Sequence, residues 1–153
     1  MAKFVYRMQN ILNLNEKLEE QAKMDYATQQ AVLNEAEEAE EALKKRKEQY
    51  EEKARRIRSD DSVKVRDLIE NSQAIEIMGG MIEEQHEVVK KEESILEVKR
   101  QALEDAMKER KTQEKLKEKA FDEFKAELLM EESKQIDQLT SYTFGIKKQK
   151  SDN

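Results

Sequence analysis

LIENSQAIEIMGGMIEEQHEVVKKEESILEVKRQAL, residues 68–103, decides the fold of this chain. An apolar residue recurs at every seventh position without a break, at Leu68, Ile75, Ile82, Val89, Leu96 and Leu103. A strict seven-residue repeat keeps one narrow apolar seam facing a partner helix, as in a left-handed coiled coil. The stretch therefore predicts a long helix that is buried along one side only.

A second seam runs through the first half of the chain. It begins with apolar residues at Phe4, Met8, Ile11, Leu18 and Ala22, and continues as a seven-residue row at Ala36, Leu43, Tyr50 and Ile57. The polar residues Asn15 and Gln29 also stand on this seam, where they weaken pairing but fix its register. This pattern predicts a first helix over about residues 4–58.

Residues 59–62, Ser-Asp-Asp-Ser, separate the two patterns. These residue types favour turns and helix N-caps, because their side-chain oxygens accept hydrogen bonds from open backbone amides. So short a connection makes two long helices antiparallel neighbours. We therefore predict an all-α fold, a single elongated domain over residues 1–153 formed by a two-helix antiparallel coiled-coil hairpin with an overhanging C-terminal helix. The second helix is expected over about 63–143, with a disordered basic tail at about 145–153.

The position of the turn also predicts which residues face each other. With the turn centred near residue 60, residue i lies opposite about residue 120 − i, so Val89 meets the Ala31 to Leu33 region. The first helix then ends opposite about residue 116, and Phe121, Phe124 and Leu128 lie on an overhang without an intramolecular partner. Such an isolated apolar stripe predicts a surface for another protein, or self-association of two overhangs.

A second excess of apolar residues surrounds Ile82. Residues 74–89 contain more apolar side chains than one seam can bury, Met78 and Met81 among them. Residues 36–42, which lie opposite, are mainly Ala and Glu and are too small to cover the rest. Part of this surface should be exposed, and methionine suits an adaptable contact. His86 at its edge is either a contact residue or an ordinary surface hydrogen-bonding residue. The Gly79-Gly80 pair either bends the helix or is tolerated there, at a cost of roughly 2 kcal/mol relative to alanine.

The composition limits the classes of function. Of the 153 residues, 42% are charged and 37% hydrophobic, with no Pro, Cys or Trp, which is typical of a coiled coil and not of a compact domain with a pocket. The formal net charge of −6 gives no general attraction to nucleic acid or anionic lipid. The lack of cysteine fits a reducing compartment such as the cytoplasm. No apolar run approaches the roughly 20 residues that span a bilayer.

No catalytic pattern is recognisable. His86 is the only histidine, cysteine is absent, and the three glycines form no phosphate-binding loop. We therefore expect no enzymatic activity, no cofactor, no metal and no small-molecule substrate. Basic clusters at 44–58 and 108–119 are interrupted by acidic residues and almost lack aromatic rings. They favour a solvated face or the docking of an acidic protein over nucleic-acid binding.

Short motifs stand near both ends of the chain. The start reads Phe4-x-Tyr6-x-Met8-x-x-Ile11-Leu12, AMKERK occupies residues 106–111, EKLKEK occupies 114–119, and Phe124, Glu127 and Ile136-Asp137 follow. These motifs resemble the flagellar export protein FliJ family, with its opening F-x-F-x-L-x-x-L-L pattern, its E-A-x-K-E-R-K and E-K-L-K-E-K elements and its closing pattern. Gln138 stands where the family usually has an acidic residue.

The resemblance implies a small cytoplasmic component of the flagellar type III export apparatus, at the cytoplasmic face of the inner membrane. The end with both termini would insert into the export ATPase ring, and another surface would contact the cytoplasmic domain of the export gate and escort export chaperones. Contact with the membrane would be indirect, through the export complex. Candidate ATPase contacts are Leu116, Phe121, Phe124 and Leu128; candidate gate and chaperone contacts are Ile75, Met78, Met81, Ile82 and His86. The alternative is a structural coiled-coil scaffold that self-associates through its C-terminal helix.

Overall fold

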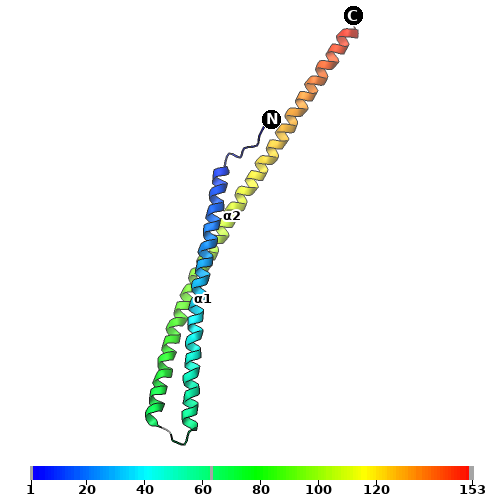
Figure 1. Ribbon diagram of the computed structural model, residues 1–153. Coiled ribbons are helices and arrows are strands. Elements are labelled where there is room, and N and C mark those ends of the chain that lie inside the picture. Colours follow the sequence, from blue (N-terminus) through cyan, green and yellow to red (C-terminus); the bar gives the residue numbers. More distant parts are fainter. Residues whose placement is uncertain (1, 63, 152–153) are drawn as a thin grey trace. The chain divides into compact units, whose positions relative to one another are not determined.

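Two long helices make up most of the described chain. The computed structural model describes residues 2–62 and 64–151, in which α1 spans Gln9–Ser59 and α2 spans Val65–Ser151 (Figure 1). The chain has no proline, and none of the glycines in α2 has a positive φ, so nothing in the sequence forces either helix to break. The predicted all-α fold of two long helices is confirmed.

The chain divides into two compact units, each containing part of both helices. Unit 1 consists of Met1–Leu18 and Ala106–Asn153, and unit 2 consists of Glu19–Asp105. In unit 2 the helices run antiparallel on either side of the predicted turn (Figure 1). Ser59 still belongs to α1, and the carbonyl of Lys64 accepts the first hydrogen bonds of α2, from the amides of Asp67 and Leu68. Residue 63, the expected start of the second helix, lies outside the described residues.

The apolar seam of unit 2 follows the seven-residue row. All six residues of that row on α2 are buried or half-buried. Leu33 and Ala36 of α1 form the apolar core of the unit together with Val89, and Leu96 packs against them. The predicted meeting of Val89 with the Ala31 to Leu33 region is therefore confirmed at Leu33.

A second row, which the apolar pattern does not reveal, brings polar side chains into the same interface. It lies three positions after the first row on α2 and includes Asn71, which is 5% exposed, together with Gln85 and Glu92. On α1 the corresponding row includes Glu40 and Lys47. Seam contacts therefore occur at alternating steps of three and four residues, as coiled-coil packing requires.

Three side-chain amides cross this interface and donate hydrogen bonds to backbone carbonyls of the opposite helix. The residue numbers in each pair add up to 121, close to the predicted register of about 120. A helical carbonyl oxygen has a second lone pair available for such a bond, and each bond contributes about 1 kcal/mol. The pairs are Asn71 with Tyr50 at 2.7 Å, Gln85 with Ala36 at 3.0 Å and Gln29 with Glu92 at 3.2 Å.

Unit 1 begins without a helix: residues 2–8 are non-helical and α1 starts at Gln9, later than the expected start at about residue 4. The ring of Phe4 packs edge-on against Phe121, with centroids 5.1 Å apart, and tilted against Phe124 at 5.5 Å. The Tyr6 hydroxyl donates to Oε1 of Gln113 at 3.3 Å. The prediction that Phe121 and Phe124 lack an intramolecular partner is therefore wrong.

Phe4 reaches the rings of Phe121 and Phe124 because a non-helical chain is longer per residue than a helix. An extended residue advances about 3.3 Å where a helical residue advances about 1.5 Å, so the residues before α1 carry Phe4 roughly 9 Å farther than a helix would. That distance equals about six helical positions, which moves the partner of Phe4 from residue 116 towards 121–124.

The start of the seam also differs from the prediction: Leu12 is buried at 3% exposure, whereas Ile11 and Leu18 are 42% and 49% exposed.

The end of α2 lies beyond the predicted boundary near residue 143. The helix continues to Ser151 through most of the expected disordered tail, while residues 152 and 153 lie outside the described residues. Lys148 and Lys150 stand in the last turn, where positive charge interacts favourably with the helix dipole. The Thr143 hydroxyl donates to the carbonyl of Leu139 at 2.8 Å, within the helix.

Candidate partner-binding surfaces

An exposed groove in unit 1 surrounds the ring of Phe121. Its floor is apolar, formed by Phe4, Leu12 and Phe121, and its sides are charged side chains of both helices, Glu16, Glu114, Lys117 and Glu118. Phe121 remains 41% exposed in this groove, although it packs on Phe4. An apolar floor with a charged rim suits an apolar side chain of a partner protein. We call this the Phe121 groove.

The four predicted ATPase-contact residues do not form one patch. Phe124 and Leu128 are half-buried, while Leu116 and Phe121 are 44% and 41% exposed. At about 100° per helical residue, Leu116 and Phe121 point about 140° apart, on opposite flanks of the interface. The structure joins Phe121 and Phe124 through Phe4, a residue that the sequence reasoning did not place in the site. The signal for it was the aromatic spacing at Phe4 and Tyr6.

In unit 2 the five predicted gate and chaperone residues fall into three settings. Met78 is only 7% exposed and belongs to the interface between the helices, so it is not part of an exposed surface. Ile75 and Ile82 are half-buried at the edge of that interface. Met81 and His86 are exposed but lie on opposite flanks, again about 140° apart. The predicted exposure in this region is real, but it is divided between two faces.

The first of these faces carries His86. Residues 75, 79, 82 and 86 follow each other at steps of four, three and four, which places them along one side of α2. Ile82 and His86 line a shallow groove together with Glu40 and Lys44 of α1. Gly79 leaves this side without a side chain, and a Cβ there would lie 3.9 Å from Nζ of Lys47. We call this side of α2 the His86 face.

A polar cluster holds the His86 face against α1. Nδ1 of His86 lies 3.0 Å from Oε1 of Glu40, and Nζ of Lys44 lies 3.3 Å from the same oxygen. Burial raises the pKa of the Glu40 carboxyl, but the hydrogen bonds to His86 and Lys44 outweigh burial and hold that pKa below its ordinary value. The carboxylate therefore fixes the position of His86 at the rim of the groove.

The second face is an apolar stripe formed by Ile77, Met81 and Val88, which are 62%, 40% and 43% exposed. Their spacing places them within about 40° of arc on α2, outside both rows of the interface. Gly80 lies beside them with nothing within 4 Å of its Cβ position. This Met81 stripe has no cover among the described residues of unit 2.

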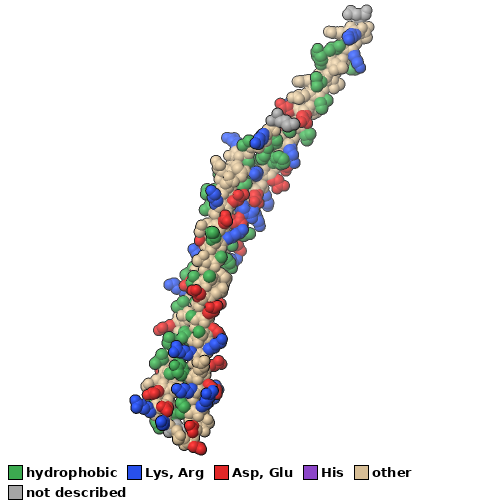
Figure 2. Space-filling model, viewed as in Figure 1, with side chains coloured by type: hydrophobic (Ala, Val, Ile, Leu, Met, Phe, Trp, Pro, Cys, Tyr) green, Lys and Arg blue, Asp and Glu red, His purple; other side chains and the backbone are tan. Residues whose placement is uncertain are grey.

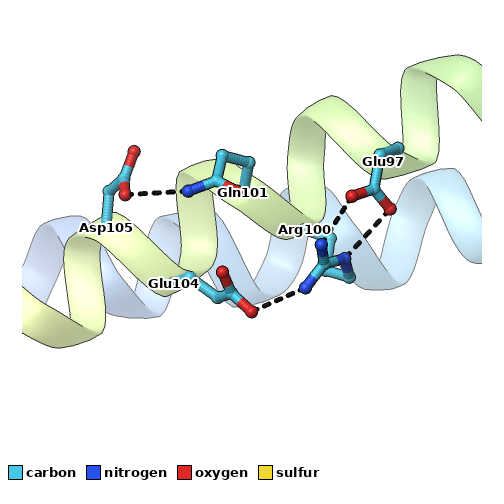
Figure 3. Close-up of polar contacts among 5 residues, drawn as sticks. All are labelled: Glu97, Arg100, Gln101, Glu104 and Asp105. Atoms are coloured by element: carbon cyan, nitrogen blue, oxygen red, sulfur yellow. Dashed lines mark hydrogen bonds and ion pairs between the residues drawn. The ribbon is translucent and has the colours of Figure 1, made fainter.

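On the polar side of α2 in unit 2, neighbouring charged and amide side chains of the same helix pair with one another. Arg100 bridges Glu97 and Glu104 at 2.5 and 2.6 Å, and Gln101 donates to Asp105 at 3.1 Å (Figure 3). The hydrogen bond from Arg100 lowers the pKa of Glu97, and the same contacts raise the pKa of Arg100. Such exposed pairs contribute a few tenths of a kcal/mol each, so this side is a solvated helix face.

The basic cluster at 44–58 is likewise interrupted. Glu52 pairs with Arg55 at 3.1 Å and with Arg56 at 3.7 Å. On the face drawn in Figure 2, Lys and Arg side chains alternate with Asp and Glu. That face therefore shows no continuous positive surface of the kind that binds nucleic acid.

Metal-binding clusters and membrane-spanning helices are both absent from residues 2–62 and 64–151. No group of three or more His, Cys, Asp or Glu side chains in these ranges is arranged to hold a metal ion. Within the same ranges, no helix combines the length and the apolar character that crossing a bilayer demands.

A family model described as "Flagellar FliJ protein" matches residues 4–149 of the 153-residue chain. The matched range includes the Phe121 groove, the His86 face and the Met81 stripe. No curated protein and no solved structure matches the chain.

Proposed function

The chain belongs to the flagellar FliJ protein family and has a role in flagellar protein export, and from this premise we propose that it links the export ATPase to the export gate and escorts export chaperones. The observation that carries the proposal is that the family match spans both units, each with an exposed apolar surface. The protein acts at the cytoplasmic face of the inner membrane and meets the membrane only through the export complex. It contributes contacts and no chemistry of its own.

Unit 1 is the proposed contact for the export ATPase. The Phe121 groove offers an aromatic floor, and aromatic side chains dominate the affinity of protein interfaces when a partner covers them. The half-buried Phe124 packs on the Phe4 ring of the groove. The half-buried Leu128 and the exposed Leu116 are proposed to extend the contact along α2 and to the opposite flank.

Binding of the purified export ATPase to the full chain, measured by calorimetry, tests this assignment. We expect Phe121→Ala to weaken binding roughly tenfold or more, because it removes the groove floor. Leu129→Ala, a comparable truncation of an exposed apolar residue in the same helix, is the matched control and should leave affinity unchanged. Equal affinity for both variants and the unmodified chain would remove the groove from the ATPase contact.

Unit 2 is the proposed contact for the gate and for the chaperones, on its two separate faces. The cytoplasmic domain of the gate is assigned to the His86 face, where Ile75, Ile82 and Gly79 form an apolar strip beside the fixed imidazole. The chaperones are assigned to the Met81 stripe, because the flexible and polarisable methionine side chain adapts to partners of different shape.

Two variants separate the faces, since both alter exposed residues; His86→Ala also removes the hydrogen bond to Glu40 of α1, so its stability is compared with that of Met81→Ala. His86→Ala should weaken binding of the gate domain and spare chaperone binding, while Met81→Ala should do the reverse. Circular dichroism of each variant controls for helix content. Loss of both partners by either variant alone would show that one shared surface binds them.

A further inference from the structure

Residues 129–151 form the last part of α2 and have no intramolecular cover. Every residue in this range is exposed, including large apolar side chains at Leu129, Met130, Ile136, Leu139, Tyr142 and Phe144. In Figure 2 hydrophobic side chains are visible along this end of α2. A single helix of this length is marginal in water unless its apolar side is covered. The segment therefore needs a partner to bury that side.

The apolar side follows a coiled-coil spacing. Ile136, Leu139, Thr143 and Ile146 succeed one another at steps of three, four and three. Tyr142 stands beside this row, within about 60° of Leu139. The row is short and narrow, which matches a second helix of the same width better than a broad surface.

The charges of the segment are separated along its length. Glu131, Glu132 and Asp137, with Lys134, occupy its first half and leave a net negative charge there. Lys147, Lys148 and Lys150 occupy its second half without any acidic residue up to Ser151. No ion pair within residues 129–151 joins these groups. The segment is therefore complementary to its own sequence read in the opposite direction.

We propose that residues 129–151 bind the same segment of a second copy of this chain as an antiparallel helix pair. In the register that places Ile136 opposite Ile146 of the second copy, Leu139 meets Thr143, and Glu132 meets Lys150 at both ends of the pair. The pair is symmetric and closed, so it yields a dimer and no filament. A parallel pair would instead set acidic against acidic and basic against basic residues.

This pairing does not rest on the export role, because all of its residues follow Leu128 and lie outside the Phe121 groove. It would operate in the free protein, whichever partners units 1 and 2 bind.

Sedimentation equilibrium of the full chain tests the pairing with two charge-reversed variants. In Glu131→Lys with Glu132→Lys both halves of the segment become basic, and in Lys148→Glu with Lys150→Glu neither half keeps a net positive charge. Each variant alone should lose self-association by roughly tenfold or more relative to the unmodified chain, whereas an equimolar mixture of the two should regain it. Glu37→Lys with Glu38→Lys, on exposed positions of α1, makes the same charge change elsewhere and should leave association unaltered.

The outcomes are distinct. Association of the unmodified chain, its loss in each variant and its recovery in the mixture would support the antiparallel pair. A chain that stays monomeric at every concentration and at low salt would overturn the proposal. So would association that persists in both variants, because the contact would then lie outside this segment.

Discussion

The side-chain amide of Asn71 on α2 donates a 2.7 Å hydrogen bond to the backbone carbonyl of Tyr50 on α1. Asn71 is 5% exposed, so its amide has exchanged water for this carbonyl. Displacing one helix by a single position would leave a buried amide without its acceptor, at a cost of about 1–3 kcal/mol. The contact therefore selects one register among those that the apolar row alone would allow.

Replacing Asn71 should expose this role. Asn71→Ala is expected to lower the free energy of unfolding by about 1–2 kcal/mol, because the hydrogen bond is lost and a small gap remains. Urea unfolding followed by circular dichroism measures the change. Asn34→Ala, at an exposed position of α1, is the control and should shift the midpoint little. Equal stability of the Asn71 and Asn34 variants would show that the buried bond does not hold the register.

Phe4 gives the corresponding test in unit 1. Phe4→Ala removes the ring that contacts Phe121 and Phe124, and should cost about 1–3 kcal/mol of local stability. Hydrogen exchange should then become faster in the first turns of α1, while exchange in unit 2 stays unchanged. The control is Val5→Ala, since Val5 is 75% exposed. Unaltered exchange near residue 9 in the Phe4 variant would contradict the packing role.

The glycine pair in α2 predicts a gain in stability on substitution. Neither Gly79 nor Gly80 has a positive φ, and a Cβ at Gly80 would have nothing within 4 Å. Gly80→Ala should therefore stabilise the protein by roughly 0.5–1 kcal/mol, because alanine favours the helix and restricts the unfolded chain. Thermal unfolding is the measurement, and a lower midpoint for Gly80→Ala would indicate that the helix needs glycine there.

Glu40 predicts a dependence of stability on pH. Its pKa in the folded protein lies below the ordinary value of 4.5, so the ionised form stabilises the fold above that pH. This contribution is lost as the pH falls through the folded-state pKa, when the carboxylate takes up a proton. Glu40→Gln should therefore be less stable than the unmodified chain near neutral pH, with the difference shrinking in acid. A difference that grows as the pH falls would have the wrong sign for this cluster.

The sequence was sufficient to predict two long helices and the apolar row, because both depend on local periodicity, but it did not predict the start of α1 at Gln9 or the end of α2 at Ser151. Leu68 to Leu103 repeat without a break, and only one side of a helix can bury such a row. The polar row could not be found in the same way, since Asn71 and Gln85 carry no hydrophobic signal. Their place depends on a carbonyl of the opposite helix, which is known only once the two backbones are paired.

The candidate surfaces likewise depend on how the two helices pair, which the sequence alone does not show. Met78 follows Ile75 by three positions, and that step would have placed it in the interface had the second row been recognised. The contact of Phe4 with Phe121 depends on the non-helical start of the chain, which shifts the pairing by about six positions. The division of the exposed residues into the His86 face and the Met81 stripe follows from the same rotation of α2 that buries Met78.

Simultaneous binding of both export partners is the strongest test of the proposed link. We assign the export ATPase to the Phe121 groove in unit 1 and the cytoplasmic domain of the gate to the His86 face in unit 2. The full chain, the ATPase and the gate domain should therefore elute from size exclusion as one complex containing all three, with Phe121→Ala releasing only the ATPase and His86→Ala only the gate domain. Mutual displacement of the ATPase and the gate domain from the chain would show that they compete for one surface, and would rule out the proposed link.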